Sequence, residues 1–391
     1  MAGRFTRAEL GLVGTAAAIV FTRVFAFSLT TLGFTEYAHG LAPGLAPAAA
    51  DLLAGIALGA YGLTMALAQF GTGILSDRVG RKPVLVGGTV VFVLGAALCA
   101  VATNVWILIA ARLLQGLGGV SSAALAAVGE TVPEERRTTA MALVGVPAGI
   151  GVFLGFILGP PLAGAVGFAG LFWATAALGL LAGLPILLRS LPAPLPGLAR
   201  PGDMRSLTLP VMGLAAAGFT INFGMNVLMY GFKSQVLDRI GETALAAILL
   251  AAFVLMGIAS RAIDRRRTNW APIVAALGVL AVAAPIFRLA HAVPLAVAGG
   301  VAFFAAHAIL SAVLPSQVSR LAGRSGGRGH GIQLVVAYLG TFAGGAIAGL
   351  VPVTEALVVL ALVAGAAAVL VAVGLARTQS IPAASAPETG S

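Results

Sequence analysis

A few ionisable side chains lie within or beside long apolar runs, where they could exchange a proton or hold a charged group. Glu36 lies at the end of the first run and His307 in the middle of the tenth, and imidazole titrates near physiological pH. Both are candidates for proton coupling, although Glu36 could be a solvated helix end and His307 a core histidine bonded to a carbonyl. Arg23 and Arg112 lie inside apolar runs, where a cation needs a polar neighbour or a ligand.

No residue pattern typical of an enzyme is present in the sequence. The chain lacks H-E-x-x-H, G-x-S-x-G and a phosphate-binding loop, its four histidines are scattered, and it has one cysteine. Metal-dependent hydrolysis, serine hydrolysis and ATP-driven pumping therefore have no residues to support them. We expect no catalytic residues, no bound metal and no cofactor.

The composition indicates that lipid is the solvent of this chain. Of 391 residues, 59% are hydrophobic and 9% are charged, and the mean hydropathy is +1.04, whereas soluble proteins carry about 25% charged residues. Since about 20 apolar residues in a helix cross the hydrocarbon core, the apolar runs predict an all-α membrane protein with twelve transmembrane helices. They lie near residues 11–37, 50–72, 84–103, 106–130, 138–166, 168–189, 208–235, 243–260, 270–288, 293–318, 331–350 and 353–376.

The positions of Lys and Arg predict the orientation of these helices. With the N-terminus inside, most of the 23 Lys and Arg residues fall in inside segments, and Arg239 and Arg288 are the two that fall in outside loops. Inside loops of membrane proteins are enriched in these residues. We therefore expect a multi-pass protein of the cell (inner or plasma) membrane with both termini in the cytoplasm. The net charge of +10 then needs no nucleic-acid partner.

The longest inside connection, 190–207, is rich in proline and divides the twelve helices six and six. Such a linker is typical of transporters that are built from repeats. We expect a first six-helix bundle at 1–189, a second at 208–376, and a disordered cytoplasmic tail at 377–391. A monomer in the lipid bilayer is the default expectation.

The inside loop after the second helix reads G-I-L-S-D-R-V-G-R-K, from Gly73 to Lys82. It resembles the loop signature of the major facilitator superfamily. The resemblance implies a conformational latch in which Asp77 meets a helix N-terminus of the other bundle, and a charged cluster of Asp77, Arg81 and Glu130; a plain positively charged inside loop is the alternative. The expected latch residues are Gly73, Asp77, Arg78, Gly80, Arg81, Lys82 and Glu130.

Two further motifs extend the resemblance. R-L-L-Q-G, with Arg112, Gln115 and Gly116, resembles the second signature of the superfamily. G-F-I-L-G-P-P-L-A-G resembles the antiporter signature of the twelve-span drug:H⁺ antiporters, except that it ends in Ala-Gly rather than in two glycines. Glycines at four-residue spacing let helices approach closely, and the residues concerned are Gly155, Gly159, Pro160 and Gly164.

The first 190 residues also resemble the YajR-like efflux transporters of that branch, in part through A-G-I-A-L-G-A-Y-G-L-T from Ala54. In this superfamily helices one and four line a central cavity, so the resemblance implies that Arg23 and Arg112 share it. Other polar residues of the apolar helices are candidates for the same cavity, although the partner of a buried amide is as often a neighbouring helix as a ligand. The candidates are Arg23, Tyr61, Gln69, Asn222, Asn226, Tyr230, Gln333 and Tyr338.

The resemblance implies the major facilitator fold, with two pseudo-symmetric six-helix bundles that work by alternating access. The expected function is secondary active export of small lipophilic or amphipathic molecules, as a proton antiporter. The alternatives are export of sugars, amino acids or organic anions, an uncoupled carrier, a lipid flippase, and a sensor that has lost transport.

Overall fold

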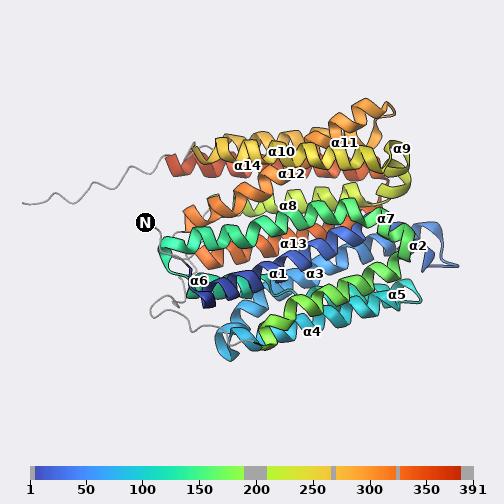
Figure 1. The fold of residues 1–391 in the computed structure, drawn as a ribbon. Helices are drawn as coiled ribbons and strands as arrows, with labels where there is room; N and C mark the ends of the chain where they lie inside the picture. Colours follow the sequence, from blue (N-terminus) through green and yellow to red (C-terminus); the bar gives the residue numbers. More distant parts are fainter. Residues whose placement is uncertain (1–4, 189–208, 266–269, 323–325, 380–391) are drawn as a thin grey trace, which may run out of the picture.

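A computed structural model describes residues 5–188, 209–265, 270–322 and 326–379 (Figure 1). Within these ranges the chain is helical and has no strand. The predicted linker at 190–207 lies outside the described residues, as does the chain beyond residue 379. The last helix continues to Gln379, so it ends later than the boundary expected at 376.

Seven helices form the first half of the structure. Gly33 and Gly167, with φ of 81° and 69°, interrupt the helical run where a residue with a Cβ would be strained. Gly33 precedes the short second helix, and Gly167 divides the seventh helix into two. The helices are α1 (Arg7–Thr31), α2 (Phe34–Gly40), α3 (Pro47–Val79), α4 (Arg81–Ala100), α5 (Val105–Leu117), α6 (Ser121–Thr131) and α7 (Glu134–Leu188).

The second half continues the helical pattern, with a π-helical turn, η2, after its first long helix. The π-helical turn and α9 meet α10 at a bend of 91°. The elements are α8 (Leu209–Met229), η2 (Lys233–Leu237), α9 (Asp238–Ile240), α10 (Glu242–Arg265), α11 (Ala271–Leu289), α12 (Val293–Ala322), α13 (Gly326–Leu350) and α14 (Val353–Gln379).

The described helices account for the predicted number of spans. Ten segments are long and apolar enough to cross a membrane, and the bent pair at 233–256 makes eleven. One of the ten, Thr139–Leu188, has 50 residues, which is about 75 Å of helix, far more than the roughly 30 Å of hydrocarbon. Because Gly167 breaks it into two helices, it supplies two spans, and the total is twelve.

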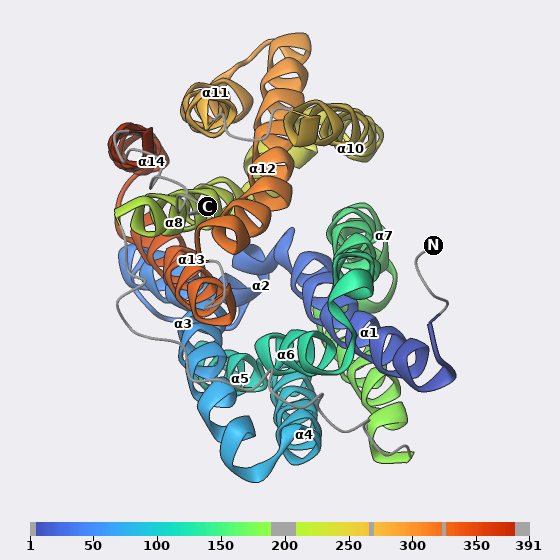
Figure 2. The ribbon, with the colours of Figure 1, turned by 90° about the vertical axis from the view of Figure 1, so that its left-hand side faces the viewer.

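The two halves meet along α3 and α13, which lie side by side between the two groups of helices (Figure 2). The contact is close because it is made through glycine: a Cβ on Gly59 would lie 2.7 Å from the carbonyl oxygen of Phe342. Small residues allow such an approach between membrane helices. The segments around α2 and α9 lie at one end of the helices, here called the α2 end, and α6 lies toward the other, the α6 end (Figure 1).

Candidate functional site

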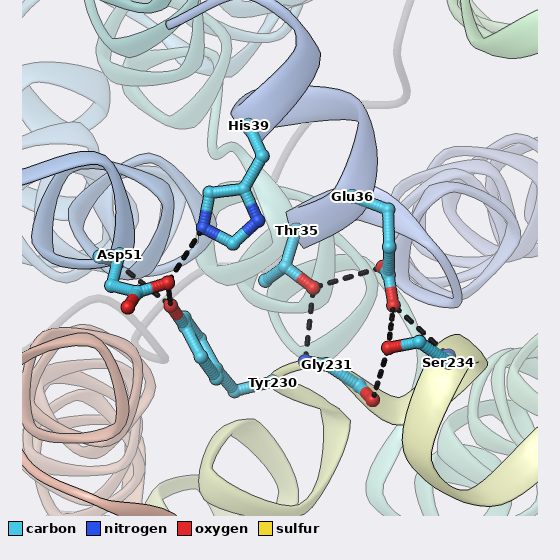
Figure 3. Close-up of polar contacts among 7 residues, drawn as sticks. All are labelled: Thr35, Glu36, His39, Asp51, Tyr230, Gly231 and Ser234. Atoms are coloured by element: carbon cyan, nitrogen blue, oxygen red, sulfur yellow. Dashed lines mark hydrogen bonds and ion pairs between the residues drawn. The ribbon is translucent and has the colours of Figure 1, made fainter. Parts of the chain in front are cut away.

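The contact around Glu36 joins the two halves at the α2 end (Figure 3). Sequence reasoning placed Glu36 in the last turn of the first span, but the break at Gly33 puts it in the first turn of α2. One carboxylate oxygen accepts hydrogen bonds from the amide and the hydroxyl of Ser234, at 3.1 and 2.9 Å. The other accepts a bond from the hydroxyl of Thr35 at 3.0 Å. Since Ser234 lies in η2, the first-half carboxylate is held by the second half.

These hydrogen bonds favour the charged form of Glu36. Burial alone would raise the pKa of Glu36, but the bonds from Ser234, from its own backbone amide and from Thr35 outweigh it and hold the pKa below its usual value. In this conformation Glu36 is therefore an anion bound across the boundary, and not a solvated helix end.

Asp51, at the start of α3, makes a second set of contacts beside Glu36 (Figure 3). The hydroxyl of Tyr230 donates to the backbone carbonyl and a side-chain oxygen of Asp51, at 3.0 and 3.1 Å. Nε2 of His39 lies 2.9 Å from the same side-chain oxygen. Burial, with the nearby Asp51 carboxylate, raises the pKa of Tyr230. Tyr230 was a candidate cavity residue, and the structure places it in this contact between the halves.

Arg288 stabilises the turn that carries Tyr230, a role that was not predicted from the sequence. It was counted as a loop residue, yet its side chain is 3% exposed. Its guanidinium donates to the carbonyls of Leu228 and Tyr230, at 3.0 and 2.6 Å, and to the side chain of Gln235 at 2.6 Å. These bonds fix the turn in which the amide of Gly231 donates to Thr35 at 2.9 Å. The available signal was an arginine in a region otherwise poor in Lys and Arg.

The residues predicted to form the latch lie toward the α6 end. Arg81 forms an ion pair with Glu130, with 3.1 Å between Nε and a carboxylate oxygen, so the proximity expected for these two residues is present. A second ion pair joins Arg136 to Glu9 at 3.0 Å. Both pairs lie within the first half.

Fewer contacts are described for the other residues of the predicted latch. The surroundings of Gly73 and the side chain of Asp77 lie outside the described part of the structure, so no contact of Asp77 is described. Arg78 is exposed, Gly80 ends α3 with φ of 92°, and Lys82 donates to the carbonyl of Leu187 at 3.3 Å.

The residues of the second signature are buried in the first half. Arg112 donates to Gln115 at 2.9 Å, so part of its hydrogen bonding is supplied by its own helix. Gly116 faces the backbone of α3, with Tyr61 and Thr64 so close that a Cβ would not fit. Arg23 is as buried as Arg112, at 2% exposure each.

The glycines of the antiporter signature hold α7 against α1. A Cβ on Gly155 would lie 2.8 Å from the carbonyl oxygen of Phe25, and one on Gly159 would lie 2.6 Å from that of Leu29. Gly164 faces open space, and Pro160 lies within the helix. The first two glycines therefore fit the close-approach interpretation, and Gly164 does not contribute to it.

The amide candidates Gln69, Asn222 and Asn226 bond either to a nearby helix or to their own helix. Gln69 accepts from the amide of Ser122 at 2.9 Å and contacts the hydroxyl of Tyr338. Asn222 and Asn226 donate to carbonyls one turn earlier in α8, at 3.1 and 2.9 Å.

Gln333, a cavity candidate, and His307, a candidate for proton coupling, are buried by different neighbours. Gln333 is 6% exposed and packs near Gly218. His307 stacks on Phe303, with 6.4 Å between ring centroids, and no hydrogen bond to its imidazole is found among the described residues.

Comparisons with known proteins agree on one family. The sequence pattern of the Major Facilitator Superfamily matches residues 10–345. The inner membrane transport protein YajR of Escherichia coli (strain K12) is 43% identical over 130 residues, which are 33% of this chain and 29% of that protein. A multidrug resistance protein B homolog of Mycobacterium tuberculosis (strain CDC 1551 / Oshkosh) is 33% identical over 164 residues, 41% of this chain and 30% of that protein. The matched regions thus span about a third of these curated relatives.

Solved structures share the fold at lower sequence identity. The crystal structure of the human organic anion transporter MFSD10 (TETRAN) superimposes with a TM-score of 0.68 at 19% identity, covering 94% of this chain and 100% of that one. At this identity the likeness concerns the fold.

Proposed function

The chain belongs to the Major Facilitator Superfamily, and from that premise we propose that it exports small lipophilic or amphipathic molecules by alternating access. The protein is a multi-pass membrane protein of this transporter family and not an enzyme. The multidrug resistance name of one relative supports the proposed substrates. Sugars, amino acids or organic anions as cargo, a lipid flippase, and a sensor without transport are the rival functions.

The contact around Glu36 is the observation that carries the proposal. Alternating access requires the halves to join at one end while the substrate site communicates with the other. Ser234 donates to Glu36 and Gly231 donates to Thr35 across the two halves, and hydrogen bonds of this kind contribute about 0.5–1.5 kcal/mol each, or about 1.5–3 kcal/mol to a charged group. A few such bonds can close one end and still break within a transport cycle.

We further propose that the α2 end faces the outside of the cell. The Lys and Arg residues concentrate in the opposite loops, which supports cytoplasmic N- and C-termini. The conformation described here would then be closed to the outside. A monomer in the cell membrane fits this arrangement.

Glu36 is the proposed site of proton coupling. Its pKa is held low while Ser234 binds it, so by linkage a proton binds more tightly once the contact has opened. An external proton would therefore favour the outward-open state, as antiport of drug against protons requires. His307 remains the second candidate, because its imidazole lies inside α12 without a described hydrogen bond.

Transport into inverted membrane vesicles tests the proposal. A panel of lipophilic dyes should accumulate when the vesicle interior is acidified, and dissipating the pH gradient should abolish the accumulation. Glu36→Gln should lose the pH-driven part, whereas Glu355→Gln, an exposed carboxylate in the first turn of α14, should keep it. Accumulation that ignores the pH gradient would support an uncoupled carrier, and no accumulation of any dye would contradict the proposed function.

A further inference from the structure

Arg112 lies inside the first half with more hydrogen-bond donors than partners. Its Nη1 donates to Gln115, while its Nε has no hydrogen-bond partner in the described part of the chain. The guanidinium carbon lies 4.9 Å from the ring centroid of Tyr61 and 5.1 Å from that of Phe34. Aromatic faces attract a cation, but these contacts leave the Nε hydrogen without an acceptor. The charge of Arg112 is therefore only partly satisfied.

Arg23 repeats this arrangement on α1. Its guanidinium carbon lies 3.6 Å from the ring centroid of Phe92, and its Nε likewise finds no acceptor within the described ranges. Its hydrogen bond to the hydroxyl of Thr89 is long, at 3.5 Å. A second buried cation is thus held mainly by an aromatic face.

Tyr61 connects the two arginines. Its hydroxyl is buried and has no hydrogen-bond partner among the described residues. Arg112 lies over its ring at 4.9 Å, and Arg23 lies over the ring of Phe92. It packs in one cluster with Phe92, and it stacks on Phe27 with 5.6 Å between ring centroids. Three buried polar groups with unused hydrogen-bonding capacity therefore surround one aromatic cluster.

No carboxylate balances these charges in the described part of the chain. The ion pairs found there are His39–Asp51, Arg81–Glu130 and Arg136–Glu9, and none includes Arg23 or Arg112. Two unbalanced cations at membrane depth are costly, so a bound anion would supply both the missing charge and the missing acceptors.

We propose that Arg23, Arg112 and Tyr61 bind the negatively charged group of a small aromatic anion. The inference rests on the proposed export of amphipathic molecules and narrows the cargo to amphipathic anions, which moves aromatic organic anions from the rival functions into the proposed one. A carboxylate or sulfonate accepts several N–H and O–H hydrogen bonds at once, and Phe27 and Phe34 offer neighbouring aromatic surface for the apolar part. Since Tyr338 of α13 packs against this cluster, the anion would lie beside the boundary between the halves.

Binding to the purified full-length protein in lipid nanodiscs tests the inference without a transport assay. The probes are 1-naphthoate and 1-naphthalenesulfonate, and the neutral 1-naphthamide is the matched control ligand. We expect the anions to bind at least about tenfold more tightly than the amide, a difference of about 1.4 kcal/mol. Arg23→Gln and Arg112→Gln should each remove about that preference, Arg112→Lys should restore part of it, and Tyr61→Phe should weaken both anions.

Arg239→Gln is the matched control variant, because Arg239 bonds the carbonyl of Phe287 at 3.2 Å and lies outside the cluster. It should leave anion binding unchanged. Should an arginine variant unfold, the wild-type comparison of anion with amide and the Tyr61→Phe variant still decide. Equal affinity for the anions and the amide, or anion binding that survives in folded Arg23→Gln and Arg112→Gln, would overturn the inference. Dye transport without an anion preference would support the proposed function and contradict this inference. Anion binding without transport would support the binding site and contradict the proposed function.

Discussion

Glu36 and Ser234 are 198 positions apart in the chain, yet the carboxylate of one accepts both the amide and the hydroxyl hydrogen of the other. Because one residue lies in each half, the pair reports directly on whether the α2 end is closed. The first two predictions concern this pair.

Ser234→Ala should shift the protein toward the state that is open at the α2 end. The variant removes the hydroxyl donor and keeps the amide, so the closed state should lose about 1.5–3 kcal/mol, as for one hydrogen bond to a charged group. Spin labels at the exposed Leu45 and Val293, in a Cys99→Ala background, would measure the change by electron-electron resonance distances. Identical distance distributions in Ser234→Ala and the parent would show that this bond does not hold the end closed.

Acid should open the same end. The pKa of Glu36 is depressed in the closed state, so the contact is fully present above the ordinary glutamate pKa and is lost as the pH falls through the lowered value. Titration of the labelled protein from pH 7 downward should show the open population rising below about pH 4.5. Glu36→Gln should remove this dependence.

Nε2 of His39 lies 2.9 Å from a carboxylate oxygen of Asp51 beside this contact, the hydroxyl of Tyr230 donates to the same oxygen, and Arg288 bonds the carbonyl of Tyr230. His39→Gln therefore serves as the control for that pH series. Should Glu36→Gln keep the acid response and His39→Gln lose it, the responsible group is His39 and not Glu36.

Asp77→Asn should shift the population toward the state that is open at the α6 end, if Asp77 acts as the latch that the sequence predicts. Coupling energies of this kind are about 1–3 kcal/mol. Labels at the exposed Val79 and Met212 would report the distance across that end. Arg78→Gln, at an exposed position beside Asp77, should change little. Because the two variants change the charge in opposite directions, an equal shift in both would argue for a general perturbation of this segment in place of a latch.

Gly59→Val should destabilise the contact between α3 and α13. Its new side chain would meet the carbonyl oxygen of Phe342, which a backbone cannot easily move away, and overpacking of this kind costs about 1–3 kcal/mol. Gly71→Val is the matched control on the same helix, because a Cβ there meets nothing within 4 Å. Thermal unfolding of both variants, followed by tryptophan fluorescence, should show a lower Tm for the Gly59 variant alone.

Arg288→Met should lower stability more than a surface change does. The substitution leaves the carbonyls of Leu228 and Tyr230 without their donor, and unsatisfied buried groups cost about 1–3 kcal/mol each. Comparison with Arg78→Met in the same unfolding assay isolates this effect. Equal Tm values would mean that water replaces the guanidinium.

The sequence was sufficient for the fold because hydropathy alone marks membrane helices. Twelve spans follow from the apolar runs, and the turn at Gly167 separates two of them where the runs at 138–166 and 168–189 were divided. The resemblance to a family was likewise carried by local motifs, and the family match over residues 10–345 confirms it. Both kinds of signal lie within short stretches of chain.

The site was less predictable because its contacts join distant segments. Nothing near Glu36 in the sequence indicates Ser234, and nothing near Arg288 indicates the turn at Tyr230 that it bonds. Hydropathy treats both charged residues as ends of spans and gives no information about their partners. Tyr230 was expected in a cavity for the same reason. A polar residue in an apolar stretch gives the same sequence pattern whether it lines a cavity or bonds to the other half.

The seven-residue helix α2 carries Thr35, Glu36 and His39 on a single rigid piece that begins at the left-handed Gly33. A tilt of this piece changes the three side chains' contacts together, so they behave as one cooperative unit and not as three separate bonds. Opening of the α2 end is then close to all-or-none, with few partly opened molecules. The effects of paired substitutions in α2 should consequently be non-additive, because the first loss already releases what the second would have held.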